Sequence, residues 1–278
     1  MKNRLLTLLL LVAIPLLNAH SAAIEVSSVQ KEVGGTVTDV VGAGVDDNFG
    51  TAAAVGSYAV FDMQKDDVDY ADLKVTYFSD NGSIGSNVMI NQTSNSQDLT
   101  DDGTISILLS SPGAGSGTFQ FDWFTTGSFV GGTQQGGSSP LSQKILYTTF
   151  DIDWEQFVAM DNSVLDYYAL NSTTALTADS AEDPGMTRIE DNTSTGTTFT
   201  DPEFAAQFMS TDSSTHQIEM GKLNNYNGTA LYMFEFRDPT SVLPGFDPVE
   251  TTVPEPTSVA MSALVLTAAF WIRRRFIS

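Results

Sequence analysis

Short stretches in which apolar and polar residues alternate dominate the middle of the chain. Bulky side chains recur at every second position in 73–77, 119–123 and 232–236. Alternate residues of a strand lie on the same face of a sheet, so each stretch would turn one apolar face toward a core. Further strands are expected over the runs 57–63, 86–91, 104–110, 145–154, 166–170, 186–189 and 217–223. The pattern predicts an all-β domain, either an antiparallel β-sandwich or a jelly roll.

Other patterns are rarer between the strands. The only segments with a helical look are 40–55 and 201–209, the second with a proline in its first turn. The Gly- and Ser-rich stretch 127–140 divides the domain, and no repeat relates the halves. We therefore expect a long loop within one sandwich rather than a linker between two small ones. Three prolines and no strand pattern predict that 239–252 is an extended spacer.

The first residues have the three parts of a secretory signal peptide. Lys2 and Arg4 give a charged start, an apolar run covers 5–17, and small residues follow over 19–23. We expect cleavage between Ala19 and Ala23. The alternative is an uncleaved anchor, which the shortness of the apolar run disfavours because a bilayer span needs about 20 residues.

The C-terminal segment 253–278 is also built from three parts in order. They are the motif Pro254-Glu255-Pro256, an apolar stretch over 259–272, and the cluster Arg273, Arg274 and Arg275. The apolar stretch is a short membrane-spanning helix, and the positive-inside rule would retain the arginines in the cytoplasm as a membrane stop. Prolines would keep the motif extended at the outer face of the inner membrane, where an enzyme could read it.

This arrangement resembles the PEP-CTERM sorting domain of Gram-negative bacteria. The resemblance covers only about the last 25 residues of the 278 and is silent on the domain that is sorted. It implies recognition by an exosortase-like membrane protease that removes the tail and passes the protein to the cell surface, in species that make exopolysaccharide. The alternative is a plain C-terminal tail anchor.

Together these segments divide the chain into a signal peptide (1–23), a β-sandwich domain (24–238), a Pro-rich spacer (239–252) and a sorting tag with its transmembrane helix (253–278). Between the two targeting segments lie 7 basic and 33 acidic residues, a net charge of −26. So acidic a surface would repel nucleic acid and would favour cations. Cysteine is absent, which excludes disulfides and thiolate chemistry.

Carboxylates are the only reactive side chains present in quantity. His20 would leave with the signal peptide, and His216, in a polar stretch, is expected to be solvated. If 145–154 is one strand, Asp151, Asp153 and Glu155 share a face, where their mutual repulsion would favour a calcium ion. The alternative is a solvated acidic face over a core that includes Trp154. Weaker calcium candidates are 66–72 and Asp98 with 101–103.

The expected role is that of a non-enzymatic surface or extracellular-matrix protein, structural or adhesive, with exopolysaccharide as a possible partner. An alternative is a calcium-assisted carbohydrate-binding module that stacks sugars on aromatic rings. The rings considered are Trp123 and Trp154, both expected in the core, and Tyr167, Tyr168 and Tyr226. A polysaccharide-active enzyme with paired carboxylates is a third reading, but so many acids make such a pair uninformative.

Overall fold

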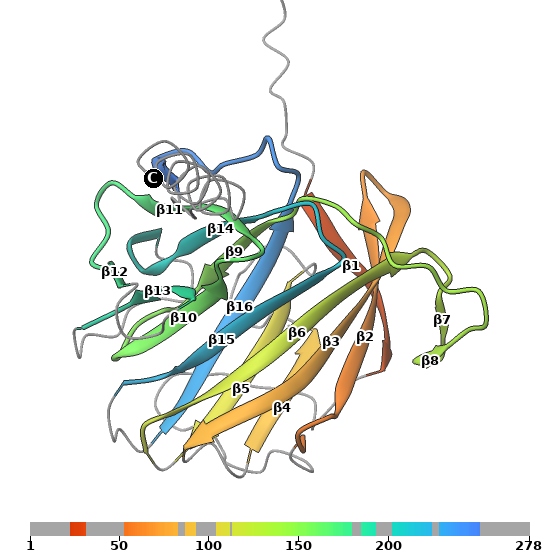
Figure 1. Cartoon of the computed structure of the whole chain (residues 1–278), viewed down its shortest axis with the longest axis horizontal. Coiled ribbons are helices and arrows are strands. Elements are labelled where there is room, and N and C mark those ends of the chain that lie inside the picture. Colours follow the sequence, from red (N-terminus) through yellow and green to blue (C-terminus); the bar gives the residue numbers. More distant parts are fainter. Residues whose placement is uncertain are drawn as a thin grey trace, which may run out of the picture.

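The computed structural model describes residues 23–31, 53–82, 87–92, 104–111, 113–179, 185–192, 202–223 and 228–250. Strands make up nearly all of its regular structure (Figure 1). The elements are β1 (Ala23–Lys31), β2 (Tyr58–Lys65), β3 (Val68–Gly82), β4 (Asn87–Gln92), β5 (Ile105–Ser111), β6 (Gly115–Thr125), β7 (Phe129–Val130), β8 (Thr133–Gln134), β9 (Leu146–Phe150), β10 (Gln156–Asp161), β11 (Leu165–Asn171), β12 (Thr177–Asp179), β13 (Met186–Glu190), the 3-10 helix η1 (Pro202–Phe204), β14 (Ala206–Ser210), β15 (Thr215–Lys222), β16 (Gly228–Arg237) and β17 (Phe246–Glu250).

Fifteen strands form one continuous antiparallel sheet, which folds over at the β1–β16 pair into two sheets that face each other. One has the strand order β12-β13-β10-β15-β6-β3-β2-β1, and the other has the order β4-β5-β16-β9-β14-β11-β17. They are joined at one side, where the start of β1 pairs with the end of β16 through Ala23 opposite Arg237. Figure 1 shows β16 and β5 passing behind β15, β6 and β3. The prediction of an all-β antiparallel domain is confirmed.

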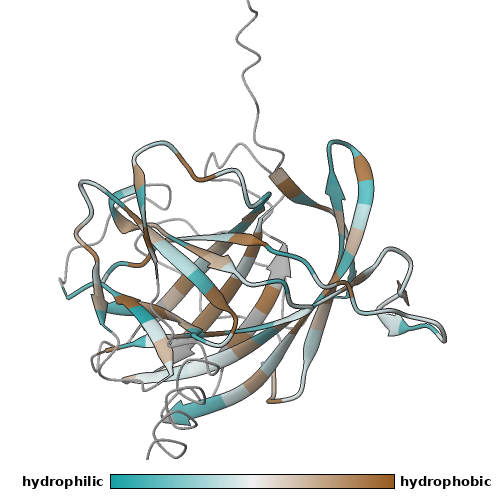
Figure 2. Ribbon diagram, turned by 45° about the horizontal axis from the view of Figure 1, so that its top comes forward, coloured by the Kyte–Doolittle hydropathy of each residue, from teal (hydrophilic) through white to brown (hydrophobic). Residues whose placement is uncertain are grey.

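The three alternating stretches of the sequence supply the centre of the core. The β3–β6 register pairs Leu73 with Trp123, Val75 with Phe121 and Tyr77 with Phe119. Across the core, the ring centroid of Phe121 lies 5.4 Å from that of Phe234 on β16 and 5.6 Å from that of Tyr147 on β9. Hydrophobic and hydrophilic bands accordingly alternate along the strands (Figure 2). Burial of these faces is the main stabilising term, because apolar area leaves water.

Two sequence predictions are corrected by strand pairing. The expected helix over 201–209 is instead η1 followed by β14, whose five residues are all buried between β9 and β11. The expected strand over 145–154 ends at Phe150. A strand that is buried on both faces has no alternating pattern, so propensity alone does not reveal it.

The segment predicted as a spacer contributes to the domain. β17 pairs with the outer edge of β11, with Pro248 opposite Ala169. Phe246 is buried against Ala169 and Ala205. Proline is tolerated here because an edge strand does not need every N–H in a ladder. The described part of this segment, 239–250, is therefore folded against the sandwich.

The Gly- and Ser-rich stretch 127–140 runs between β6 and β9 and so connects the two sheets. It contains the small hairpin β7–β8, which projects to the right in Figure 1. Asp72 of β3 anchors its start, since its carboxylate accepts N–H bonds from Gly127 (3.3 Å) and Phe129 (2.8 Å). Asp66 and Asp67 form the β2–β3 turn with φ of 54° and 60°, as in a type I′ hairpin. The acidic run 66–72 is thus a turn and a strand.

Several predicted features fall outside the described residues. They are the signal peptide up to residue 22, the tag from Pro254 to Arg275, the helical pattern over most of 40–55, the acids at 98–103, and Tyr226. Over the ranges that the structure covers, no helix has the length and apolar character needed to cross a membrane.

Candidate functional site

The loop between β9 and β10, residues 151–155, has an unusual backbone. Asp151, Trp154 and Glu155 adopt left-handed φ values of 67°, 51° and 60°. Such values are uncommon for non-glycine residues, they cost free energy, and they cluster where a loop has a function. The predicted alternation is wrong here: Asp151, Ile152 and Asp153 are all buried, whereas Trp154 is 41% exposed.

Two carboxylates of this loop are buried inside the protein. Asp151 is 6% exposed and Asp153 is 4% exposed. Gln156 Nε2 donates a hydrogen bond of 3.3 Å to Asp153 Oδ1. Burial first, and then the charge of Asp153, raise the pKa of Asp151 well above its ordinary value. Burial first, and then the charges of Asp151 and Asp153, also raise the pKa of Tyr232.

Backbone contacts from three elements hold the loop in place. Asp191, which follows β13, accepts the N–H of Glu155 (3.3 Å) on Oδ2. The Ile152 N–H donates to the carbonyl of Phe204 in η1 (3.1 Å). The carbonyl of Glu155 accepts the N–H of Leu223, just after β15 (2.8 Å). The ends of two strands and a 3-10 helix thus set a backbone shape that the local sequence would disfavour.

The structure buries Asp151 and Asp153, whereas Glu155, the third predicted ligand, contributes backbone hydrogen bonds and has a half-buried side chain. In the part of the chain that the structure describes, no group of three or more His, Asp or Glu side chains is placed to hold a metal ion. Sequence reasoning missed Asp191 and Gln156. Asp191 reaches the loop from the end of β13, distant in sequence, and Gln156 directly follows the loop as the first residue of β10.

A second buried polar group was also missed. His216 is fully buried, and the expectation that it is solvated is wrong. Trp123 Nε1–H donates to the hydroxyl of Tyr147 (2.8 Å), and that hydroxyl forms a hydrogen bond with His216 Nδ1 (2.7 Å). Burial lowers the pKa of His216 to about 4, although a hydrogen bond with the backbone of Thr211 acts to raise it. The ring is therefore neutral near pH 7. Enclosed in this way, the chain of hydrogen bonds stabilises the core rather than meeting a substrate.

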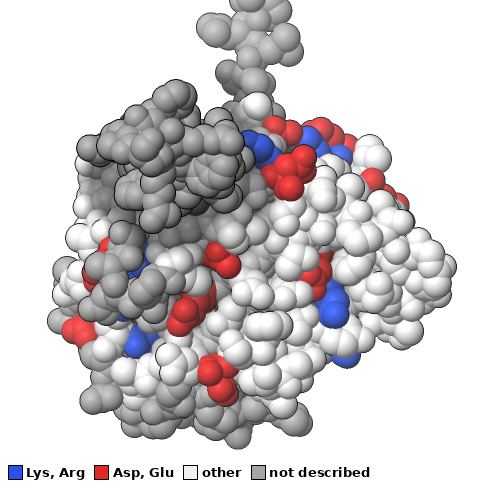
Figure 3. Space-filling view, viewed as in Figure 1, with Lys and Arg blue, Asp and Glu red and all other residues white. Residues whose placement is uncertain are grey.

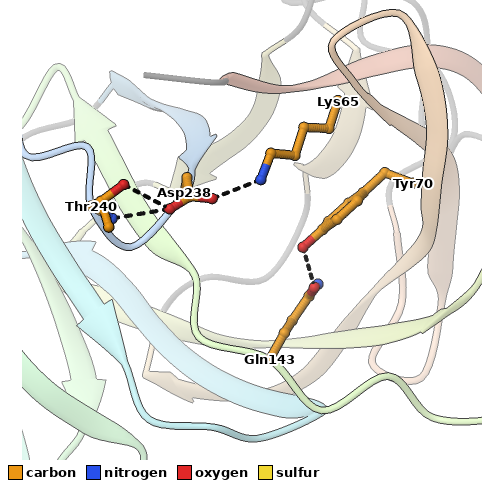
Figure 4. Close-up of polar contacts among 5 residues, drawn as sticks. All are labelled: Lys65, Tyr70, Gln143, Asp238 and Thr240. Carbon is orange, nitrogen blue, oxygen red and sulfur yellow. Dashed lines mark hydrogen bonds and ion pairs between the residues drawn. The ribbon is translucent and has the colours of Figure 1, made fainter. Parts of the chain in front are cut away.

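Polar contacts tie the β2–β3 hairpin to distant segments (Figure 4). Lys65 Nζ lies 2.6 Å from Asp238 Oδ2, and Thr240 donates to Asp238 Oδ1 through both N (3.1 Å) and Oγ1 (2.9 Å). The hydroxyl of Tyr70 donates to Gln143 Oε1. Hydrogen bonding to Lys65 lowers the pKa of Asp238. These contacts anchor the chain after β16, and their partial exposure suits a structural role.

The aromatic residues considered for sugar stacking differ in their access to solvent. Trp123 is fully buried, as predicted, and cannot meet a ligand, whereas Tyr167 and Tyr168 on β11 are half-buried. The prediction that Trp154 belongs to the core is wrong. Its ring is the large aromatic surface presented by the strained loop.

The chain was also compared with known proteins. No protein-family model, no curated protein and no solved structure matches it. Its function must therefore be inferred from its own residues.

Proposed function

We propose that this protein is exported and displayed at the cell surface, or released into the extracellular matrix, of a Gram-negative bacterium, where it has a structural or adhesive role. The observation that carries the proposal is the three-part C-terminal segment: Pro254-Glu255-Pro256, an apolar stretch and an arginine cluster. The signal-peptide pattern at the other end provides the route across the inner membrane. The direct partners are that membrane before processing and an exosortase-like protease.

The fold suits a protein that works outside the cell. Its two sheets bury a large aromatic core without any disulfide. β1 starts beside the end of β16 at the upper side of Figure 1, so the domain can begin directly after a cleaved leader. β17 ends at Glu250, four residues before the Pro-Glu-Pro motif, so under this proposal the domain would lie close to the membrane before processing.

The charges favour a surface role without nucleic acid. Acidic residues outnumber basic ones in the sequence. Figure 3 shows charged residues of both signs scattered over one face of the molecule. The part of that face that projects to the right carries few charged residues. The loop 126–143 contributes to this uncharged surface and has no ionisable side chain. Repulsion by the acidic remainder would exclude polyanions such as DNA, and the neutral loop offers hydrogen-bonding groups to a polysaccharide matrix.

The sorting step can be tested in the native host. Replacing Pro254, Glu255 and Pro256 together by alanine is expected to leave the tail attached and the protein in the inner-membrane fraction, because the recognition motif is lost. Mass spectrometry of the mature protein would read both ends, and fractionation would locate it. Pro244→Ala, at an exposed proline outside the motif, is the matched control and should mature normally. Wild-type protein in the cytosol with its leader intact would refute the proposal.

A second candidate function is carbohydrate binding through the strained loop, favoured by the exposed ring of Trp154 beside buried carboxylates. Aromatic faces stack on sugar rings, and a side chain held at 41% exposure loses little entropy on binding.

Trp154→Ala is expected to abolish retention of the protein on a polysaccharide that the wild type binds in a glycan array. Phe78→Ala is the control, because Phe78 is a similarly exposed aromatic residue on β3. Absence of wild-type binding to acidic and neutral polysaccharides alike would eliminate this candidate.

A further inference from the structure

Two lysines converge on one tyrosine at the surface of the sheet that contains β1, β2 and β3. The ammonium nitrogens of Lys31 on β1 and Lys74 on β3 lie 3.6 and 4.8 Å from the ring centroid of Tyr58 on β2. Within the described ranges, neither lysine forms an ion pair with a carboxylate. Other basic side chains do have an acidic partner: Lys65, Lys144, Arg188 and Arg237.

Strand pairing places the two lysines on neighbouring strands of one face. Val60 of β2 pairs with Lys31 on one side and with Lys74 on the other. Phe61 packs into the core, so Tyr58, at a position of opposite parity on the same strand, lies on the outer face. Both nitrogens face the same ring, and they can be no farther apart than the sum of their distances from its centroid. Both side chains are half-buried rather than enclosed, so a ligand can reach them.

The acids of this face are held by neutral donors instead of by the lysines. Asp62 on β2 accepts hydrogen bonds from the side chains of Ser28 and Gln30 on β1. Asp122 on β6 accepts them from Thr215 of β15 (2.8 Å) and from a glutamine of its own strand (2.9 and 3.0 Å). The face therefore carries two ammonium groups that its own carboxylates do not neutralise by direct contact.

The β7–β8 hairpin, which projects from the sheet in Figure 1, holds part of this arrangement in place. Its turn residue Gly132 donates its N–H to Gln30 Oε1 (3.2 Å), and its carbonyl accepts the hydroxyl of Tyr58 (3.1 Å). Gly132 has a φ of 74°, and a Cβ there would lie only 2.6 Å from the Cβ of Lys31. The hairpin thus packs on the stem of Lys31, and a site that is already held loses less entropy on binding.

Neutral hydrogen-bonding side chains extend across the sheet from the same tyrosine. The register lines up one residue from each of four adjacent strands, β2, β3, β6 and β15: Tyr58, Thr76, Gln120 and Gln217. All four are half-buried, and Gln217 Nε2 donates to Gln120 Oε1 (3.3 Å). Neighbouring strands are spaced by about 4.8 Å, so the row is several sugar hydroxyls long. Its amides can both donate hydrogen bonds to hydroxyl groups and accept them.

We propose that Lys31 and Lys74 bind the carboxylate of an acidic sugar in a sparsely charged polysaccharide, whose neutral sugars lie along this row. A carboxylate has two oxygens and can accept charge-assisted hydrogen bonds from two ammonium groups at once. The charges of the polymer must be sparse, because the acidic remainder of the protein would repel a dense polyanion such as DNA. The choice of a polysaccharide rests on the proposed extracellular role, whereas the binding itself does not depend on delivery.

Retardation of the full chain on columns of immobilised polymer tests the site. Hyaluronan, which carries a carboxylate on every second sugar, should retard the wild type. The same polymer after reduction of its carboxylates to alcohols should not, because the anion is lost while the hydroxyls remain. Polyglutamate should retard the wild type less than hyaluronan does, since it offers carboxylates without sugar hydroxyls. Double-stranded DNA should give no retardation.

Variants locate the contact. Lys31→Gln and Lys74→Gln are each expected to weaken binding by about three- to tenfold, because each removes one partly exposed charge-assisted contact. The double variant should not be retarded, and Lys74→Arg should retain binding because it keeps the charge. Lys144→Gln is the matched control, since it changes the net charge equally at an exposed lysine that is already paired with Asp166. Thermal unfolding of each variant shows whether it is folded, and a purely structural role of the lysines would change the Tm without changing retardation.

Four results would overturn the inference. They are a wild type that hyaluronan does not retard, equal retardation by the carboxyl-reduced polymer, a folded double variant that binds like the wild type, and retardation by polyglutamate as strong as by hyaluronan. The last result would assign the lysines to an acidic peptide instead. None of these results bears on sorting, and cytosolic protein in the native host would refute the proposed function without changing any column result.

Discussion

Replacing Phe121 by alanine is expected to lower the free energy of unfolding by about 3–5 kcal/mol. Phe121 is fully buried on β6 and lies at the contact between the two sheets. Its ring meets Tyr147, Phe234 and Phe236 of the opposite sheet, at centroid distances of 5.6, 5.4 and 6.3 Å. Truncation removes buried apolar area and leaves a cavity that three large rings cannot fill without leaving their own contacts.

Urea denaturation of wild type and variant, followed by tryptophan fluorescence, measures the loss. Phe78→Ala is the matched control: the same residue type on the neighbouring strand β3, but 49% exposed, so a change within about 0.5 kcal/mol is expected. Equal effects of the two substitutions would mean that Phe121 does not pack between the sheets as described.

Acidification is expected to destabilise the protein through His216. Its pKa is about 4 in the folded state and 6.5 in the unfolded chain, so between these values the unfolded state binds more protons. Stability contributed by this group is therefore complete above pH 6.5 and is lost as the pH falls toward 4. The full effect is about 3 kcal/mol, and about 2 kcal/mol appears between pH 7 and pH 5.

Measurements should stop near pH 5, because the isoelectric point is about 4.1 and solubility falls there. The raised pKa values of Asp72 and Asp151 act in the opposite direction, since a folded state that holds their protons gains stability in acid. His216→Asn retains those aspartates and has an amide that can hydrogen-bond with the hydroxyl of Tyr147. The difference between wild type and variant therefore isolates the histidine. Identical pH slopes, or an NMR titration of His216 near pH 6.5, would contradict the burial described.

Alternation in the sequence was sufficient to predict the all-β antiparallel domain and its inner faces. The bulky residues of 73–77, 119–123 and 232–236 are buried as predicted. Alternate residues of a strand lie on the same face, so apolar residues at every second position form one face that packs into the core. The signal peptide and the sorting tag are also read from sequence alone, since they act as linear motifs, and they stay predictions.

Some strands and buried residues could be identified only from the tertiary structure, because they leave no alternating pattern in the sequence. β14 and β10 are buried on both faces and carry no period, while β17 gains its partner only because β11 offers a free edge. His216 looked solvated from its neighbours in sequence, yet pairing of β15 with β6 carries it inside.

The candidate site shows the same division. Its acids were evident in the sequence, but their arrangement was not, because it depends on a strand that ends at Phe150 and on contacts from β13, η1 and the end of β15. Periodicity follows from the geometry of one strand, whereas the position of a carboxylate inside a protein follows from which other strands close over it.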